Sequence, residues 1–409
     1  MRSLKLITTI IALFVSVFAY ANTNVQKPDA KASAEQSKVN KTPMKIIYGP
    51  YVHGVSETEA TVVWVTNKPA ISWVEIAPKD NTSFYAEQRP RYFNAPLGRK
   101  LIDTFHTIKI KNLQPNTKYR YRIVSRCVVD DDVRTHYGET VGTRVWRNVL
   151  PEFKTLDTSK KEITFSVVND IHEKSNEMSN LLKFVPKNSE FLMLNGDMVH
   201  SMRTQDQMFK SFLNVAGDFS NKGIPMFMIR GNHEARGTIE CDFMKYFPTP
   251  TNKPYFTYRV GHVMFVVIDG GEDKPDNDIE YSDRADFDTY RKEQAQWLKD
   301  VINSKEYKDA PVKILVTHIP PSWGGWHGSI HFQKMFAEII NNAGFSLIIS
   351  GHLHKHVFAP TSDSVKVPNI INSNCVLMNV HVDSEKITMK FLDSEGKKTT
   401  DDIVVDVKK

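Results

Sequence analysis

The feature of this sequence that most constrains its fold is a set of five apolar segments that each end on polar residues of the metal-binding types. The segments are Ile163–Val168, Phe191–Leu194, Met226–Ile229, Ile314–Val316 and Phe345–Ile349. Each is short, rich in β-branched, aromatic or other apolar residues, and bounded by polar stretches, as expected for strands buried in a sheet. Helix-like segments lie between them, so the pattern predicts an α/β domain.

The polar groups that follow these segments contain carboxylate, amide and imidazole side chains. They are Asn169-Asp170-Ile171-His172, Asn195-Gly196-Asp197, Gly231-Asn232-His233-Glu234, Thr317-His318 and Gly351-His352-Leu353-His354. Ligands of open α/β sheets bind beyond the carboxyl ends of the strands, so these groups can converge although they are far apart in the sequence. Any one group alone is most simply a turn, but five in succession predict a metal site.

The ligand types indicate which metal ions to expect. The pair Asn232-His233 offers a neutral, hard amide oxygen next to an imidazole that can face a substrate held by the ion. Mixed oxygen and nitrogen ligands suit Mn, Fe or Zn.

The motif order Asp-x-His, Gly-Asp, Gly-Asn-His-Glu, His and Gly-His-x-His resembles that of calcineurin-like metallophosphoesterases, from Glu162 to about Val357. The resemblance implies a layered α+β sandwich that holds two divalent or trivalent transition-metal ions, Mn, Fe or Zn. A metal-bridging hydroxide would attack phosphorus in line. The resemblance implies that Asp170, His172 and His354 bind one ion. It implies that Asn232, His318 and His352 bind the other ion and that Asp197 binds both.

We assign catalysis to Asp197, which would hold both ions, and to His233. His233 is not an implied ligand, so it would act on the phosphate or on the leaving-group oxygen as an acid or as a charge stabiliser. Glu234 has two interpretations, an orienting partner of His233 or a solvated turn residue.

A β-sandwich in front of such a domain resembles the arrangement of purple acid phosphatases. That subgroup has a tyrosine three positions after the aspartate of its second motif, where this chain has His200. It has no histidine in its first motif, where this chain has His172. The coloured tyrosinate ligand is therefore missing, and the iron preference does not carry over. For His200 two roles stay open, a second-shell or solvent-facing position and a substrate contact.

Two further segments are candidates for shaping the substrate pocket. The stretch Pro320–His327 directly follows the fourth motif and is rich in glycine and tryptophan. Its Trp323, Trp326 and His327 could cover a leaving group, or the two tryptophans could pack against the N-terminal domain. The acidic stretch Gly270–Asp288 is typical of a solvated loop, and near the metals it would disfavour nucleic acids.

The first domain is expected over residues 45–155. Alternating apolar and polar residues recur in segments typical of an all-β sandwich, Ala60–Val65, Ser72–Ile76, Phe105–Ile110 and Lys118–Val124. Leu113–Tyr119 resembles the tyrosine-corner stretch of fibronectin type III domains, and Trp64 fits an early buried position. The polar stretch Asp130–Tyr137 is expected to be a loop.

The second domain is expected over residues 156–409. Arg291–Ile302 has Ala295, Leu298 and Ile302 at helical spacing, which predicts a packing helix. Alternating segments at Val376–Val382, Lys386–Leu392 and Ile403–Val407 predict closing strands of the second sheet in a layered sandwich of helices and sheets.

Residues 1–21 have a short basic start, an apolar run and a small-residue end, which is typical of a cleaved signal peptide. The run is too short for a membrane anchor, so we expect export to the periplasm or secretion and no stable membrane span. Residues 22–44 are rich in Lys, Ala, Ser and Asn, which is typical of a disordered tether.

Charge and cysteine content exclude two classes of protein. The formal net charge of +6 falls to +4 on cleavage, because residues 1–21 hold two basic and no acidic side chains. This is too small to indicate a nucleic-acid partner. Cys127, Cys241 and Cys375 allow at most one internal bridge, so the chain is not a disulfide scaffold.

These observations predict an exported phosphohydrolase with two metal ions that acts on small phosphomonoesters. A phosphodiesterase or nucleotide pyrophosphatase is the alternative among enzymes. The alternative of another class is a binding or adhesion protein whose phosphatase domain has lost activity, and the intact set of ligand residues argues against it.

Overall fold

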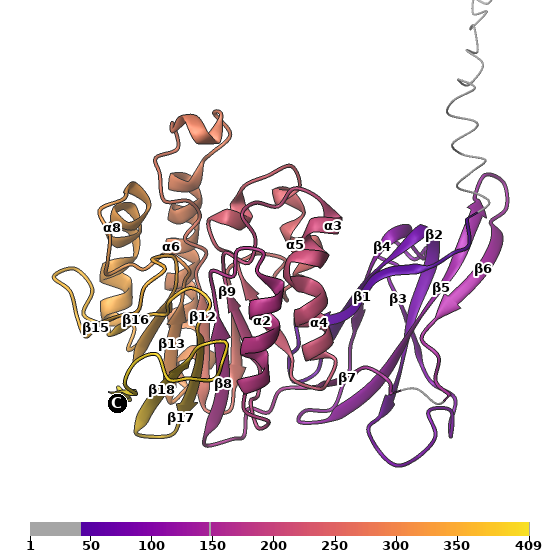
Figure 1. The fold of residues 1–409 in the computed structure, drawn as a ribbon, viewed down its shortest axis with the longest axis horizontal. Helices are drawn as coiled ribbons and strands as arrows, with labels where there is room; N and C mark the ends of the chain where they lie inside the picture. The colour runs from indigo at the N-terminus through magenta and orange to yellow at the C-terminus, as the bar shows by residue number, and fades with distance from the viewer. Residues whose placement is uncertain (1–41, 147–148, 409) are drawn as a thin grey trace, which may run out of the picture. The chain divides into compact units, whose positions relative to one another are not determined.

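The computed structural model describes residues 42–146 and 149–408 (Figure 1). The predicted signal peptide and most of the predicted tether lie outside the described residues. Within the described ranges, no helix has both the length and the apolar character needed to cross a bilayer. Cys127, Cys241 and Cys375 are all free thiols.

The N-terminal part is an antiparallel sheet of seven strands, β1 (Ile46–His53), β2 (Ala60–Pro78), β3 (Arg91–Phe93), β4 (Ile102–Ile110), β5 (Lys118–Asp130), β6 (His136–Gly142) and β7 (Glu152–Lys154). Two predicted strands are one, because β2 continues through an irregularity between Val65 and Ala70. Trp64 is fully buried, as expected. The Gln114 N–H donates to the Tyr119 hydroxyl oxygen at 3.0 Å, as in a tyrosine corner.

The prediction of a loop over Asp130–Tyr137 was wrong at both ends. Strand β5 runs to Asp130 and β6 begins at His136, so the two strands form a hairpin. Tyr137 pairs with Val128 across it, and the Arg126 guanidinium lies 4.0 Å from the centre of the Tyr137 ring. Cross-strand pairing and this cation–π contact stabilise residues whose polarity alone indicated a loop.

The second part contains two six-stranded sheets. The first has the order β10-β9-β8-β17-β18-β19 and consists of β8 (Ile163–Val168), β9 (Leu192–Asn195), β10 (Met226–Ile229), β17 (Leu377–Val382), β18 (Lys386–Leu392) and β19 (Ile403–Asp406). The second has the order β11-β12-β13-β14-β16-β15 and consists of β11 (Phe256–Val260), β12 (Val263–Val267), β13 (Val312–Val316), β14 (Leu347–Ser350), β15 (Val357–Ala359) and β16 (Asn369–Ile371). The closing strands β17 to β19 therefore complete the first sheet, whereas we had expected them in the second.

Helices cover the outer face of each sheet, which gives the predicted layered α/β sandwich (Figure 1). They are α2 (Ser175–Leu181), α3 (Gln205–Met208), α4 (Asn214–Ser220), α5 (Phe243–Tyr246), α6 (Phe287–Asn303), α7 (Lys305–Lys308) and α8 (His327–Asn342). Strand β12 shows why the layers form. Val263, Phe265 and Val267 join the core between the sheets, while Met264 and Val266 pack with residues of α6 and α8. The predicted packing helix is part of α6, with Ala295 and Leu298 buried.

Parallel pairing places the motif-bearing strand ends at one edge. Strands β8, β9 and β10 are parallel neighbours in the first sheet, and β13 and β14 are parallel neighbours in the second. The Asp170 N–H donates to the Gly196 carbonyl at 3.0 Å, and the Gly351 N–H donates to the His318 carbonyl at 2.9 Å. The carboxyl ends of the strands therefore carry the candidate site, as expected for α/β sheets.

His53 at the end of β1 is a buried neutral imidazole whose ionisation should limit acid stability. Its Nδ1 lies 2.9 Å from the Pro248 carbonyl oxygen, and its Nε2 accepts the Met228 N–H at 3.1 Å. Burial lowers the pKa of His53 to about 4. The unfolded chain takes up this proton near pH 6.5, so the free energy of unfolding should fall as the pH is lowered from about 6.5 to about 4.

We expect His53 to contribute about 2 to 3 kcal/mol to this acid destabilisation. Urea unfolding of the wild type and of His53→Gln at pH 7 and at pH 5 measures it. The variant should lose less stability between the two pH values than the wild type. An equal loss in both proteins would show that another group is responsible.

Candidate metal centre

The first group of candidate ligands joins the ends of β8 and β14. Asp170, His172 and His354 each offer a ligand atom, and these atoms all lie within 4.8 Å of one another. His354 Nε2 lies 3.1 Å from Asp170 Oδ1 and 3.0 Å from His172 Nε2. One carboxylate and two imidazoles in this arrangement can bind a transition metal.

The second group joins the ends of β9, β13 and β14. Asp197, His318 and His352 again have ligand atoms within 4.8 Å of one another, and His318 Nε2 lies 3.0 Å from Asp197 Oδ2. The Asn232 amide oxygen lies 3.0 Å from His352 Nδ1, so it belongs to the same group. His318 Nε2 is also only 3.9 Å from Asp170 Oδ1, so the two groups adjoin.

The electrostatics of the two groups fit cations. Asp170 Oδ1 and His318 Nε2 are buried and form no hydrogen bond within the described part of the chain. Burial lowers the pKa of His318, but the carboxylates of Asp197 and Asp170 more than reverse this effect and raise it to about 10. Burial opposes ionisation of both aspartates, yet His318 holds their pKa values below the usual range. A site that stabilises a proton this strongly favours positive charge, and its oxygen and nitrogen donors suit Mn, Fe or Zn.

Local backbone strain supports this assignment. Asp170, His172, Asp197, His352 and His354 all have positive φ, between 46° and 72°. Non-glycine residues rarely adopt this conformation, and where they do they often lie at functional sites. Gly196 has φ of 85°, and a Cβ there would lie 2.4 Å from His318 Nδ1. Only glycine therefore allows the β9 turn and the His318 ring to pack this closely.

Glu234 has a role that neither interpretation of the sequence anticipated. Its carboxylate is fully buried and accepts backbone N–H groups of Gly231, Asp197 and Met198 at 2.7 to 3.0 Å. Burial, together with the charge of Asp197, raises the pKa of Glu234 to about 7. Glu234 therefore positions the loop that carries Asp197 and is not a solvated turn residue.

Glu234→Gln should weaken the Asp197 loop, because an amide nitrogen would face backbone N–H groups that need an acceptor. We expect a loss of about 2 kcal/mol in the free energy of unfolding, measured by urea titration of the metal-free protein. Metal affinity should fall about 10- to 100-fold. Glu293→Gln, at an exposed position on α6, is the matched control, and equal losses in both variants would contradict the assignment.

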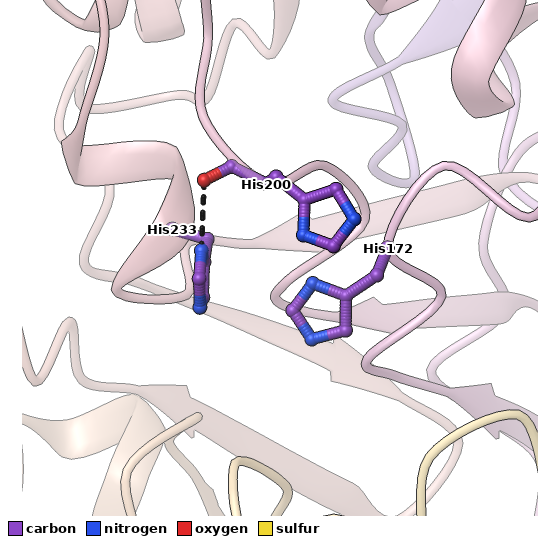
Figure 2. A group of neighbouring side chains, drawn as sticks. All are labelled: His172, His200 and His233. Carbon is purple, nitrogen blue, oxygen red and sulfur yellow. Dashed lines mark hydrogen bonds between the residues drawn. The ribbon is translucent and has the colours of Figure 1, made fainter.

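His233 is held by the loop that follows β9. Its Nδ1 lies 2.8 Å from the His200 carbonyl oxygen (Figure 2), which leaves Nε2 3.9 Å from Asp197 Oδ2. The backbone of His200 therefore orients His233, the role that we had considered for Glu234. The His200 ring itself stacks on His172, with ring centres 4.9 Å apart.

The aromatic loop contributes one residue to the edge of the site. Trp326 lies edge-on to His352 with ring centres 5.4 Å apart, and it is 42% exposed. Trp323 lies beside the Lys355 ammonium and is equally exposed, so neither side chain is buried in a domain core. His327 Nε2 lies 2.9 Å from Asp288 Oδ1, and its ring stacks on His331, so these contacts are with residues outside the two ligand groups.

The acidic stretch is not simply a solvated loop. Glu272 is fully buried and accepts two hydrogen bonds from the Arg236 guanidinium, at 2.5 and 2.7 Å. Asp273 Oδ2 lies 3.9 Å from His352 Nε2. With His352 Nδ1 near Asn232, Asp273 is placed to orient the ring of His352, as carboxylates commonly do for ligand histidines.

Two asparagine side chains at the centre were assigned no role from the sequence. The Asn169 amide donates to Asp170 Oδ2 at 2.6 Å and to the Asn372 carbonyl at 3.0 Å, while the Asn372 amide donates to Asn169 Oδ1 at 2.7 Å. These hydrogen bonds between Asn169 and Asn372 fix the Asn169 amide that binds the Asp170 carboxylate. Asn169 precedes the first motif directly, which is the one hint that the sequence offers.

Two family matches cover most of the described chain. Residues 163–356 match the calcineurin-like phosphoesterase family, and residues 47–137 match the N-terminal domain of purple acid phosphatases. Among curated proteins, human serine/threonine-protein phosphatase CPPED1 is 25% identical over 188 residues, 42% of this chain and 56% of the relative. The mouse protein is 25% identical over 197 residues, 45% of this chain and 58% of the relative. The chain thus spans little more than half the length of these relatives.

Solved structures show the same fold at low identity. Purple acid phosphatase PPD1 from yellow lupin (Lupinus luteus) superposes with a TM-score of 0.63 at 13% identity, over 87% of this chain and 73% of that chain. PhoD superposes with a TM-score of 0.58 at 11% identity, over 90% of this chain and 92% of that chain. This chain therefore contains a domain that matches the calcineurin-like phosphoesterase family, preceded by a domain that matches the N-terminal domain of purple acid phosphatases.

Proposed function

We propose that this chain is an exported phosphohydrolase that uses two metal ions to hydrolyse small phosphomonoesters. The observation that carries the proposal is the contact between the two ligand groups, with Asp170 Oδ1 and His318 Nε2 only 3.9 Å apart. Ions bound there would lower the pKa of a water between them and hold phosphoryl oxygens. Export is supported by residues 1–21 alone.

The residues of the chain would divide the work as follows. Asp170, His172 and His354 would hold one ion, and Asn232, His318 and His352 would hold the other. Asp197, which lies in the second ligand group, would be shared between them. His318 donates its Nδ1–H to the Asn195 carbonyl, at 2.7 Å, so its Nε2 is the nitrogen left for an ion. His233 is fixed in the same way through Nδ1, so its Nε2 is left to act on the phosphate or on the leaving-group oxygen, as an acid or as a charge stabiliser.

The test is an activity panel with the purified mature protein. It is assayed with 4-nitrophenyl phosphate, bis(4-nitrophenyl) phosphate and ADP, each with added Mn, Zn or Fe. We expect metal-dependent turnover that is fastest for the monoester. Turnover of the diester alone, or of ADP alone, would instead establish the phosphodiesterase or pyrophosphatase alternative. Metal binding without turnover of any ester would favour a binding protein.

A further inference from the structure

Three imidazoles converge beside the first ligand group. The ligand nitrogens of His172, His200 and His233 lie within 4.8 Å of one another. His172 stacks nearly parallel to His200 and lies edge-on to His233, with ring centres 4.9 and 4.8 Å apart (Figure 2). His200 is exposed to solvent, so a substrate can reach this cluster.

The rings of His172 and His233 each keep one nitrogen for a ligand. His172 Nε2 faces the first ligand group, and its buried Nδ1 forms no hydrogen bond with any described residue. An imidazole that ligates a metal through Nε2 carries its proton on Nδ1, so this atom is a donor. His233 Nδ1 is already held by the His200 carbonyl, which leaves Nε2 for a ligand.

The carboxylate of Glu173, which follows His172 in the sequence, is held by other partners. Glu173 Oε1 accepts the side-chain amide of Gln207 at 2.6 Å and the backbone N–H of His200 at 3.3 Å. The cluster therefore presents imidazole nitrogens, with Asp197 Oδ2 3.9 Å from His233 Nε2 at its inner end. Imidazole N–H groups that converge in this way are suited to an anionic oxygen.

We propose that the side chain of His200 determines substrate specificity, because together with His172 and His233 it binds a phosphoryl oxygen that only a monoester presents. This inference rests on the proposed function. The two ions can each take one non-bridging oxygen. A monoester has a third non-bridging oxygen and carries close to two negative charges at neutral pH, whereas a diester has only two such oxygens and one charge. The imidazole cluster is placed to bind the third.

The test compares His200→Ala with the wild type on a monoester and a diester. The ratio of kcat/KM for 4-nitrophenyl phosphate to that for bis(4-nitrophenyl) phosphate should fall about 10- to 100-fold, as for loss of a hydrogen bond to a charged group. His200→Asn keeps a donor and tests for partial recovery of the ratio. His136→Ala, at an exposed histidine of the N-terminal domain, is the matched control and should leave the ratio unchanged.

Calorimetric titration with inorganic phosphate and with dimethyl phosphate gives a readout that does not depend on turnover. In the metal-loaded protein, His200→Ala should weaken phosphate binding about 10-fold or more and dimethyl phosphate binding much less. Equal loss for both ligands, or reduced metal content in the variant, would overturn the inference. If the wild type hydrolyses no ester, the proposed function fails, and the titration still decides the role of His200.

Discussion

Asp197→Asn is expected to lower kcat/KM for a phosphomonoester by about 1,000-fold or more. Asp197 lies in the second ligand group, with Oδ2 3.0 Å from His318 Nε2. In the proposed function it is also the carboxylate shared by the two ions, so its removal would weaken both metal sites. Charge stabilisation by a metal ion is worth several kcal/mol in such a reaction. Steady-state assays in the presence of excess metal measure the effect.

The substitution is chosen so that the fold survives. Asp197 has φ of 56°, a conformation that asparagine tolerates better than most residues. Asp309→Asn, at an exposed helix end, is the control and should keep full activity. Activity of Asp197→Asn within about tenfold of the wild type would show that Asp197 does not hold the ions.

The second large effect concerns the neighbouring residues Asn232 and His233. His233→Ala should lower kcat about 100- to 10,000-fold, the range for a lost general acid, while the bound metal is retained. Asn232→Ala should lower metal affinity, because it removes an amide oxygen 3.0 Å from His352 Nδ1. Assays of kcat together with metal content separate the two roles.

Two outcomes would contradict the assignment of Asn232 to the metal and of His233 to the substrate. If His233→Ala loses metal as readily as Asn232→Ala, His233 is a ligand or a structural residue. If Asn232→Ala retains metal and loses only rate, the amide serves the substrate. Because the two residues are adjacent in the sequence, any general disturbance of the turn should affect both variants alike.

The sequence was most informative where ligand-type residues directly follow the strands of a parallel sheet. Strands such as β8 and β13 were recognisable from apolar runs, and the polar residues after them could be placed at one edge because parallel strands end together. The structure brings Asp170, His318 and His352 together as expected. Residue type and position after a strand were enough for this step.

The same reasoning failed where a side chain's role depends on distant partners. Glu234 follows the third motif directly, yet it binds backbone N–H groups of the second motif, which no local pattern reveals. Glu272 is fully buried and pairs with the partly exposed Arg236, although it looks like a surface residue in its own stretch. A buried charge is recognisable only when its partner is known.

The sequence also did not predict which sheet the last three strands join. The alternation in β17 to β19 shows that they are half-buried strands, but it does not say which neighbour each strand finds. Strand β17 pairs with β8, which lies far from it in the sequence at the start of the same domain, so these strands extend the first sheet. Register and partner choice depend on the complete core, which local periodicity does not describe.

The measurement that tests the central claim most directly is the metal content of the purified protein, taken together with its activity. We predict two equivalents of Mn, Zn or Fe per chain by elemental analysis, activity that chelation removes and metal restores, and loss of both metal and activity in His352→Ala. A wild-type protein that binds no metal, or a His352→Ala variant with full activity, would contradict the account.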